Sequence, residues 1–122
     1  MAGEKYDDRK QKWHAMPLCV LKPLADVFEA GVKKYSKFNC LEQFEDADER
    51  FYDGMMRHIE ACQLNPLAYN NEDKCYHAPQ AAFNILMRFY HAKLEKDKAV
   101  IDVNNLLKEL LGQDIKVIFE KP

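Results

Sequence analysis

The most constraining feature of this sequence is the long stretch after Pro79, in which apolar residues recur every three or four positions. This spacing is the signature of one face of an α-helix. Proline fits the first turn of a helix, so Pro79 is expected near its start. We predict a core-facing stripe made of Ala82, Ile85, Leu86, Phe89 and Tyr90. A second, more polar line on the same helix contains His77, Asn84, Arg88 and His91.

Two earlier stretches show the same periodicity. The first predicts a helix over residues 24–37, with Pro23 in its first turn and Val27, Phe28, Val32 and Tyr35 on its apolar face. The second predicts a helix that begins at Leu41 or Glu45 and ends at Leu64. Its apolar stripe contains Phe51, Met55, His58, Ile59 and Cys62, so His58 is expected to face inward.

The remaining segments complete an all-α prediction. Residues 1–22 indicate an extended arm, residues 65–76 a loop, and residues 101–111 a short fourth helix with Asp102 as its cap and Gly112 as its stop. Residues 113–122 alternate apolar and polar side chains, which is typical of a strand. A lone strand needs a partner, either the arm or a second subunit. We therefore expect one domain over residues 1–122, a small bundle of about four helices, in a homo-oligomer.

Composition excludes several classes of protein. The chain has 122 residues, of which 48% are hydrophobic and 31% charged, and this is a globular composition rather than a disordered one. A net charge of −2 argues against binding to a nucleic-acid backbone. No apolar run reaches the length of a membrane span, and the start lacks the apolar core of a signal peptide. We expect a cytoplasmic protein, with no membrane or nucleic acid as a partner and with its four cysteines as thiols.

Three clusters could carry chemistry. His58, Cys62, Cys75 and His77 have side chains that bind zinc, although their spacing does not match a zinc finger. Acidic residues on the second helix and in the loop could hold a hard cation such as Mg²⁺. Lys33, Lys34 and Lys37 either complement the dipole of the first helix or bind phosphate. No glycine-rich phosphate loop and no serine nucleophile motif is present.

Five short motifs occur in an order that resembles one family. They are Lys5-Tyr6-Asp7-x-x-Lys10, Gly31-x-x-Lys34-Tyr35-x-x-x-Asn39, Arg57-His58-x-x-Ala61, Glu72 followed five residues later by His77, and Ala81-Ala82-x-Asn84. This pattern, over roughly residues 5–90, resembles the phage and bacterial dATP/dGTP diphosphohydrolases, a helical group likened to the MazG-type nucleotide pyrophosphatases. The resemblance implies an oligomeric all-α enzyme that uses Mg²⁺ or Mn²⁺ to convert a purine dNTP, dGTP or dATP, to dNMP and pyrophosphate.

The resemblance also implies roles for individual residues. Lys10, Lys34 and Arg57 would bind the triphosphate, with Asp7 of the first motif beside them. Glu72 would bind the metal, supported by Asp53, Glu60 and Asp73. His58 or His77 would orient or deprotonate the attacking water. Asn39 and Asn84 would bind the nucleotide through their amides, and Tyr35 would stack on the base.

Each role has a structural alternative. His58 can be a buried, hydrogen-bonded histidine, His77 can cap its helix, and Tyr35 can belong to the core. The chain also departs from the family pattern, with Asn39-Cys40 for Asn-Trp, Asn65-Pro66 for Gly-Glu, Asn70 for an aspartate and Lys74 for a glycine. Two acidic positions are lost, which favours an alternative function: a protein that binds a nucleotide without hydrolysing it. A purely structural module is the third hypothesis.

Overall fold

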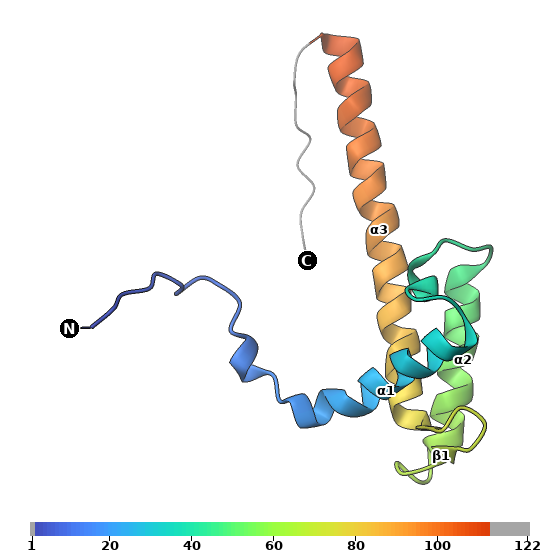
Figure 1. The fold of residues 1–122 in the computed structure, drawn as a ribbon. Coiled ribbons are helices and arrows are strands. Elements are labelled where there is room, and N and C mark those ends of the chain that lie inside the picture. Colours follow the sequence, from blue (N-terminus) through green and yellow to red (C-terminus); the bar gives the residue numbers. More distant parts are fainter. Residues whose placement is uncertain (1, 113–122) are drawn as a thin grey trace.

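The computed structural model describes residues 2–112 and consists mainly of three α-helices (Figure 1). They are α1 (Leu18–Lys34), α2 (Ala47–Cys62) and α3 (His77–Leu111). Two 3₁₀ turns, η1 (Trp13–Ala15) and η2 (Asn39–Leu41), precede α1 and α2. A two-stranded antiparallel ribbon of β1 (Tyr69–Asn70) and β2 (Cys75–Tyr76) joins α2 to α3, with Tyr69 paired to Tyr76 and Asn70 to Cys75.

The core lies between α2 and the first half of α3, which run antiparallel (Figure 1), and α1 crosses them. Gly54 allows a close approach of α2 and α3, because a Cβ at this position would stand 2.6 Å from Asn84 Oδ1. Aromatic rings pack beside this contact. Phe28 meets Phe83 edge to face at 5.1 Å, and Phe51 stacks on the buried His91 ring at 5.5 Å. Nε2 of His91 also lies 2.9 Å from the carbonyl oxygen of Cys40. His91 therefore ties the loop before α2 to the core.

The predicted core face of α3 is wrong. Ile85, Leu86 and Phe89 are exposed, and the buried positions are Gln80, Ala81, Asn84, Met87 and His91. The more polar of the two lines on this helix therefore faces α2, because Gly54 leaves room for a polar side chain at the crossing. On α1, Val27 is buried but Phe28, Val32 and Tyr35 are exposed. The most apolar surfaces of α1 and α3 thus remain uncovered in the single chain.

Two helix boundaries also differ from prediction. Helix α1 begins at Leu18, so Pro23 lies inside the helix and not in its first turn. Proline cannot donate to the carbonyl four residues earlier. Here that carbonyl belongs to the exposed Cys19, where water can satisfy it. The N-terminal arm is correspondingly shorter than 1–22.

The third and fourth predicted helices are a single helix. No glycine or proline interrupts residues 80–111, and this segment is rich in Ala, Leu, Lys and Glu, which have high helix propensity. Asp102 is therefore inside α3 and caps nothing. Gly112 does end the helix, with a φ of 64° and its N–H bonded to the Lys108 carbonyl. The predicted C-terminal strand at 113–122 lies outside the described residues.

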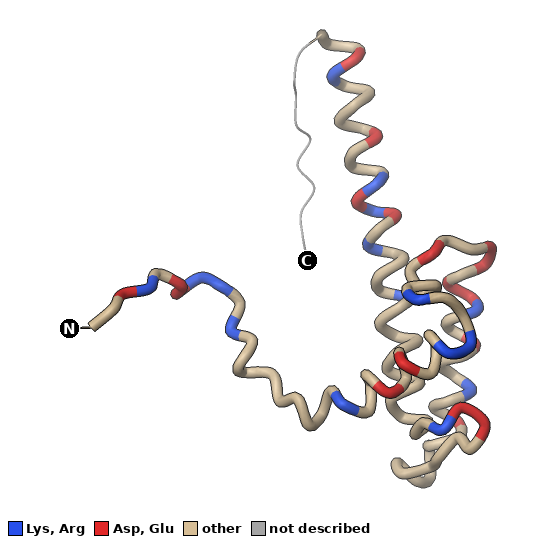
Figure 2. The backbone as a smooth tube through the Cα atoms, in the orientation of Figure 1, with Lys and Arg blue, Asp and Glu red and all other residues tan. Residues whose placement is uncertain are grey.

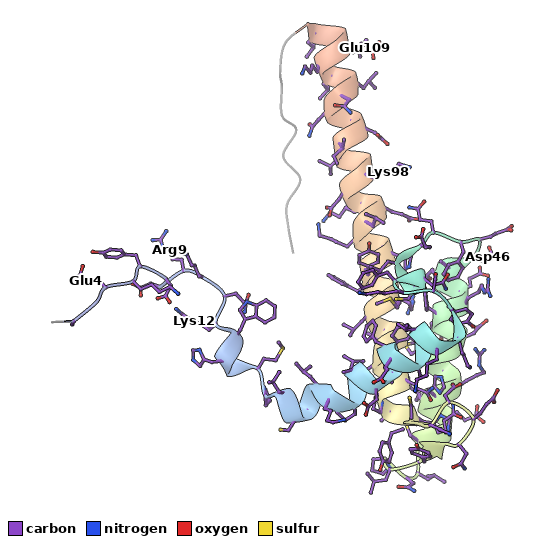
Figure 3. All side chains as sticks on the ribbon, in the orientation of Figure 1. Glu4, Arg9, Lys12, Asp46, Lys98 and Glu109 are labelled. Carbon is purple, nitrogen blue, oxygen red and sulfur yellow. The ribbon has the colours of Figure 1, made fainter. Side chains whose placement is uncertain are left out.

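The second half of α3 projects beyond the helical core. Figure 3 shows side chains crowded around α1, α2 and the start of α3, whereas those near Lys98 and Glu109 stand apart from the other helices. Exposed apolar residues line this half, among them Ile101, Leu106 and Leu110. Within residues 2–112, no helix is long and apolar enough to cross a bilayer.

Candidate functional site

A groove of about 890 Å³ opens between the second half of α1, the η2 segment, α2 and the first half of α3. It brings together eight of the residues selected from the sequence, which are Lys34, Tyr35, Asn39, Asp53, Arg57, His58, Asp73 and Asn84. Figure 2 shows Lys and Arg, in blue, at the end of α1 and again along α2, with Asp and Glu, in red, between them. The groove is therefore of mixed charge and contains cations that a phosphate ligand would need.

Asp73 is the carboxylate at the centre of a hydrogen-bonded cluster. Asn70 shapes the loop, since its Oδ1 accepts the backbone N–H groups of Glu72 and Asp73 at 3.1 and 3.2 Å. Asn70 Nδ2 then donates to Asp73 Oδ2 at 3.1 Å, and Gln80 Nε2 donates to the same oxygen at 2.9 Å. The loop and the first turn of α3 thus fix the orientation of this carboxylate.

The other oxygen of Asp73 faces Lys34. Lys34 Nζ forms an ion pair with Asp73 Oδ1 at 2.5 Å, although no donor is aligned for a regular hydrogen bond to this buried oxygen. Bonding to Lys34 lowers the pKa of Asp73, and bonding to Asp73 raises the pKa of Lys34. Asp73 is therefore ionised at neutral pH, with one oxygen held by Asn70 and Gln80 and the other neutralised by a lysine.

His58 and His77 form a pair at the contact between α2 and α3. Their Nδ1 atoms are 2.9 Å apart, so one donates a proton to the other. Burial, and then the charge of His77, lower the pKa of His58. His58 lines the groove, and His77 supports it from behind. His58 is therefore part-buried and hydrogen-bonded, as its structural alternative predicts, and it also lines the groove.

Two more polar residues line the groove from the helices. Asn84 is buried, and its Nδ2 donates to the Gln80 carbonyl at 2.8 Å, which fixes its amide beside Gly54. Asp53 and Arg57 lie one turn apart on α2. No ion pair joins them among residues 2–112, so the simple alternative of an i,i+4 pair is not realised. Tyr35 is not a core residue, since it is exposed at the end of α1.

The remaining predicted residues lie elsewhere. Asp7 and Lys10 are on the arm, where Asp7 pairs with Lys12, and the arm extends away from the helices (Figure 1). Glu60 and Glu72 are exposed and do not line the groove. The zinc set does not come together either: His58 and His77 meet, but Cys62 donates to the Ile59 carbonyl, and the buried Cys75 donates to that of Asp26. All four cysteines are free.

The groove suits a divalent ion that shares its ligands with a phosphate. Within residues 2–112, no three His, Cys, Asp or Glu side chains gather into a cage for a metal. However, Mg²⁺ is typically bound through one or two carboxylates together with substrate phosphates. Asp53 and Asp73 line the same groove, and Asp73 Oδ1, which pairs with Lys34, would be open to a metal once Lys34 moves to a phosphate. These residues fit such a shared site.

Sequence analysis missed Gln80, Asn70 and Gly54. Gln80 extends the polar line of α3 at a spacing of three from His77 and four from Asn84, and this spacing was a usable signal. Asn70 stands three residues before Asp73, a spacing typical of an Asx turn. Nothing in the sequence marks Gly54, because its role depends on a neighbour 30 residues away.

One of the comparisons with known proteins identifies a family. A sequence model described as "dATP/dGTP diphosphohydrolase, N-terminal" matches residues 1–100, and this range includes the whole groove. No curated protein and no solved structure matches the chain.

Proposed function

This chain belongs to the dATP/dGTP diphosphohydrolase family, and from that premise we propose that it converts a purine dNTP, dGTP or dATP, to dNMP and pyrophosphate with Mg²⁺ or Mn²⁺. The observation that carries this proposal is the groove itself. It brings the cations Lys34 and Arg57, the carboxylates Asp53 and Asp73, and the hydrogen-bonded His58 into one open space, among other charged residues. These are the parts that hydrolysis at an α-phosphate requires.

Phosphate binding falls to Lys34 and Arg57. The guanidinium of Arg57 can hold two phosphate oxygens at once, and the ammonium of Lys34 provides a compact charge. Lys34 is at the last position of α1 and half exposed, so it can exchange its contact with Asp73 for a phosphate oxygen. Such an exchange would release Asp73 Oδ1 when the substrate arrives.

His58 is the proposed general base. When its Nδ1–H donates to Nδ1 of His77, Nε2 carries no proton and can accept one from a water molecule in the groove. Because its pKa is lowered, His58 is neutral at pH 7 and can accept a proton. Water then attacks the α-phosphorus, and the bond to the oxygen that bridges the α- and β-phosphates breaks. Pyrophosphate leaves with the electron pair, and the proton from water passes to His58.

Asp53 and Asp73 are the proposed metal ligands. A bound divalent ion supplies charge neutralisation at the phosphoryl oxygens and acidifies water. The chain contributes the orientation of Asp73, which Asn70 and Gln80 hold through Oδ2, so that Oδ1 is directed to the groove. Glu72 would join this set only by turning inward from its exposed position.

Product analysis tests the proposal. The purified protein is incubated with each dNTP and NTP and Mg²⁺ or Mn²⁺, and the nucleotides are separated by chromatography. We expect metal-dependent dGMP or dAMP with pyrophosphate. Asp73→Asn and His58→Gln should abolish turnover. Glu60→Gln, on the same helix as His58 but outside the groove, is the control. A Glu72→Gln variant that loses activity while Asp73→Asn keeps it would show that the metal ligands are assigned to the wrong carboxylate.

One observation favours a second function. The Lys34–Asp73 ion pair neutralises the carboxylate best placed for a metal, and two acidic positions of the family pattern are absent. A protein with this groove could bind and sequester a purine nucleotide without hydrolysing it. Tight nucleotide binding in gel filtration, with no product from any nucleotide, would support this function over hydrolysis.

We also propose that the chain works as a homo-oligomer. Ile85 and Phe89 on α3 and Val32 on α1 are exposed on faces whose periodicity is typical of a packed surface. The arm that carries Asp7 and Lys10 extends away from its own groove (Figure 1). A second copy would cover the apolar faces and bring an arm to a neighbouring groove.

A further inference from the structure

Two groups of residues line the groove. The first contains the Lys34–Asp73 ion pair and His58. The second, here called the aromatic end, contains Phe38 and Phe44, with the cations Lys37 and Arg50 over their rings. Arg50 and His58 are eight residues apart on α2, which is about 12 Å along the helix axis. This separation is comparable to the distance between the base and the terminal phosphates of an extended nucleotide.

Phe38 is an unusual residue at the aromatic end. Its backbone is in the left-handed region, with a φ of 63° and a ψ of 17°, which is a true outlier for a bulky side chain. Its ring is 63% exposed although it lines the groove. Glycine or asparagine would occupy this backbone conformation with less strain. Strained residues of this kind gather at ligand-binding sites, where the local structure holds them in place.

The neighbours of Phe38 suit a flat heteroaromatic group. Lys37 Nζ lies 5.1 Å from the Phe38 ring centroid, and the Arg50 guanidinium lies 5.0 Å from that of Phe44. Aromatic rings and guanidinium planes both stack on nucleobases. Arg50 can donate to the N7 and O6 acceptors of guanine, and the Asn39 amide can donate and accept at an adenine edge. Both residues line the groove.

We infer that Phe38 is the base-stacking residue of this site, with the purine between Phe38 and the Arg50–Phe44 pair and the triphosphate directed to Lys34 and Arg57. The inference rests on the proposed function, because the triphosphate fixes the direction of the ligand. It assigns base stacking to Phe38, in the segment between α1 and α2.

The experiment compares two ligands that share the triphosphate. The first is the dGTP analogue with an imido group between the α- and β-phosphates, which resists hydrolysis at that bond. The second is inorganic tripolyphosphate, which has no base. Their dissociation constants are measured by calorimetry with Mg²⁺ for the parent protein, Phe38→Gly and Tyr52→Ala. Tyr52 is the matched control, since it also lies under a cationic side chain, Arg88, at 5.1 Å but outside the groove.

We expect Phe38→Gly to weaken binding of the dGTP analogue at least about fivefold, with unchanged affinity for tripolyphosphate. Its melting temperature should not fall, because glycine relieves the positive φ, and this separates lost binding from lost folding. Tyr52→Ala should bind both ligands like the parent. Unchanged affinity of Phe38→Gly for the dGTP analogue, or equal weakening for both ligands, would overturn the inference alone. A parent protein that binds neither ligand would overturn the proposed function and the inference together.

Discussion

The imidazole rings of His58 and His77 meet with their Nδ1 atoms 2.9 Å apart, so a single proton lies between them. Burial of His58 is the largest cost of a second proton, and the positive charge that this proton would place beside His77 adds to that cost. The pKa of His58 is lowered for both reasons. Stability and the proposed chemistry therefore depend on the same titration.

The first prediction concerns pH. Because the pKa of His58 is lower in the folded chain, the unfolded chain binds the proton first as pH falls below about 6.5. The free energy of unfolding should therefore decrease from pH 7 toward pH 5. Urea unfolding at several pH values measures this slope. His58→Gln should flatten it in this window, and His14→Gln, on the exposed η1 turn, should not.

A second window lies at lower pH. The pKa of Asp73 is also lowered, by Lys34 first, so the stability that Asp73 contributes is present above about 3.8. It should be lost as pH falls through the lowered value. Asp73→Asn should remove this second loss. If the free energy of unfolding falls equally with pH below 4 in the parent and in Asp73→Asn, the pairing of Asp73 with Lys34 is not the cause of this loss.

The second prediction concerns Gly54. Gly54→Ala should destabilise the protein by about 1–3 kcal/mol, as overpacking does, because the new Cβ would lie 2.6 Å from Asn84 Oδ1. Gly31→Ala is the control, since nothing lies within 4 Å of its Cβ position and alanine favours the helix. Denaturant unfolding measures both. If Asn84→Ala does not rescue Gly54→Ala, the clash is not the cause.

The third prediction concerns Lys74, which has a φ of 57°. A residue with a Cβ in this region costs roughly 1–2 kcal/mol. Lys74→Gly should therefore raise the melting temperature. Lys74→Ala removes the same charge but keeps the Cβ, so it should show no comparable gain. A similar gain in both variants would assign the effect to charge.

The fourth prediction concerns Lys34. Lys34→Met should destabilise the protein by about 1 kcal/mol, a modest value because solvent screens the half-exposed lysine. The variant also frees Asp73 Oδ1 for a metal. Mg²⁺ should therefore raise the melting temperature of Lys34→Met more than that of the parent, since ligand binding stabilises the folded state. Equal shifts in calorimetry would argue against Asp73 as a ligand.

The fifth prediction concerns assembly. The double variant Ile85→Glu and Phe89→Glu places charges on the exposed face of α3. It should convert an oligomer to monomers in gel filtration with light scattering. Asp97→Lys, farther along the same helix, is the control for added charge. A monomeric parent protein would contradict the proposed assembly directly.

The family, the all-α class and the approximate position of α2 could be predicted from the sequence, because periodicity and ordered motifs are local signals. The number of helices could not be predicted from the sequence. Asp102 is a good capping residue, but a cap acts only where the chain leaves the helix, and nothing between residues 80 and 111 breaks it. The face that α3 buries also depended on Gly54, a contact between distant positions.

The candidate site was predicted in part. Residues on α2 and at the end of α1 meet in the groove because helix periodicity places them on facing surfaces. The choice among loop carboxylates was harder, since Glu72 and Asp73 are adjacent and point in different directions. The Asx turn at Asn70 holds the backbone N–H of Asp73, and the Asp73 side chain accepts a hydrogen bond from Gln80. Arm residues such as Lys10 lie away from the groove of their own chain (Figure 1), so the sequence alone does not predict which groove they would join.

Helix α3 has a mechanical consequence. Its first turns carry His77, Gln80 and Asn84, and the same uninterrupted helix continues for about 30 Å beyond His91. Because no glycine or proline interrupts it, this helix fixes both the distance and the rotation between its two ends. A second protein whose helix continues α3 without a break would be held at a defined angle to the proposed nucleotide groove. The distal end of α3 is therefore a suitable position for rigid helical fusions.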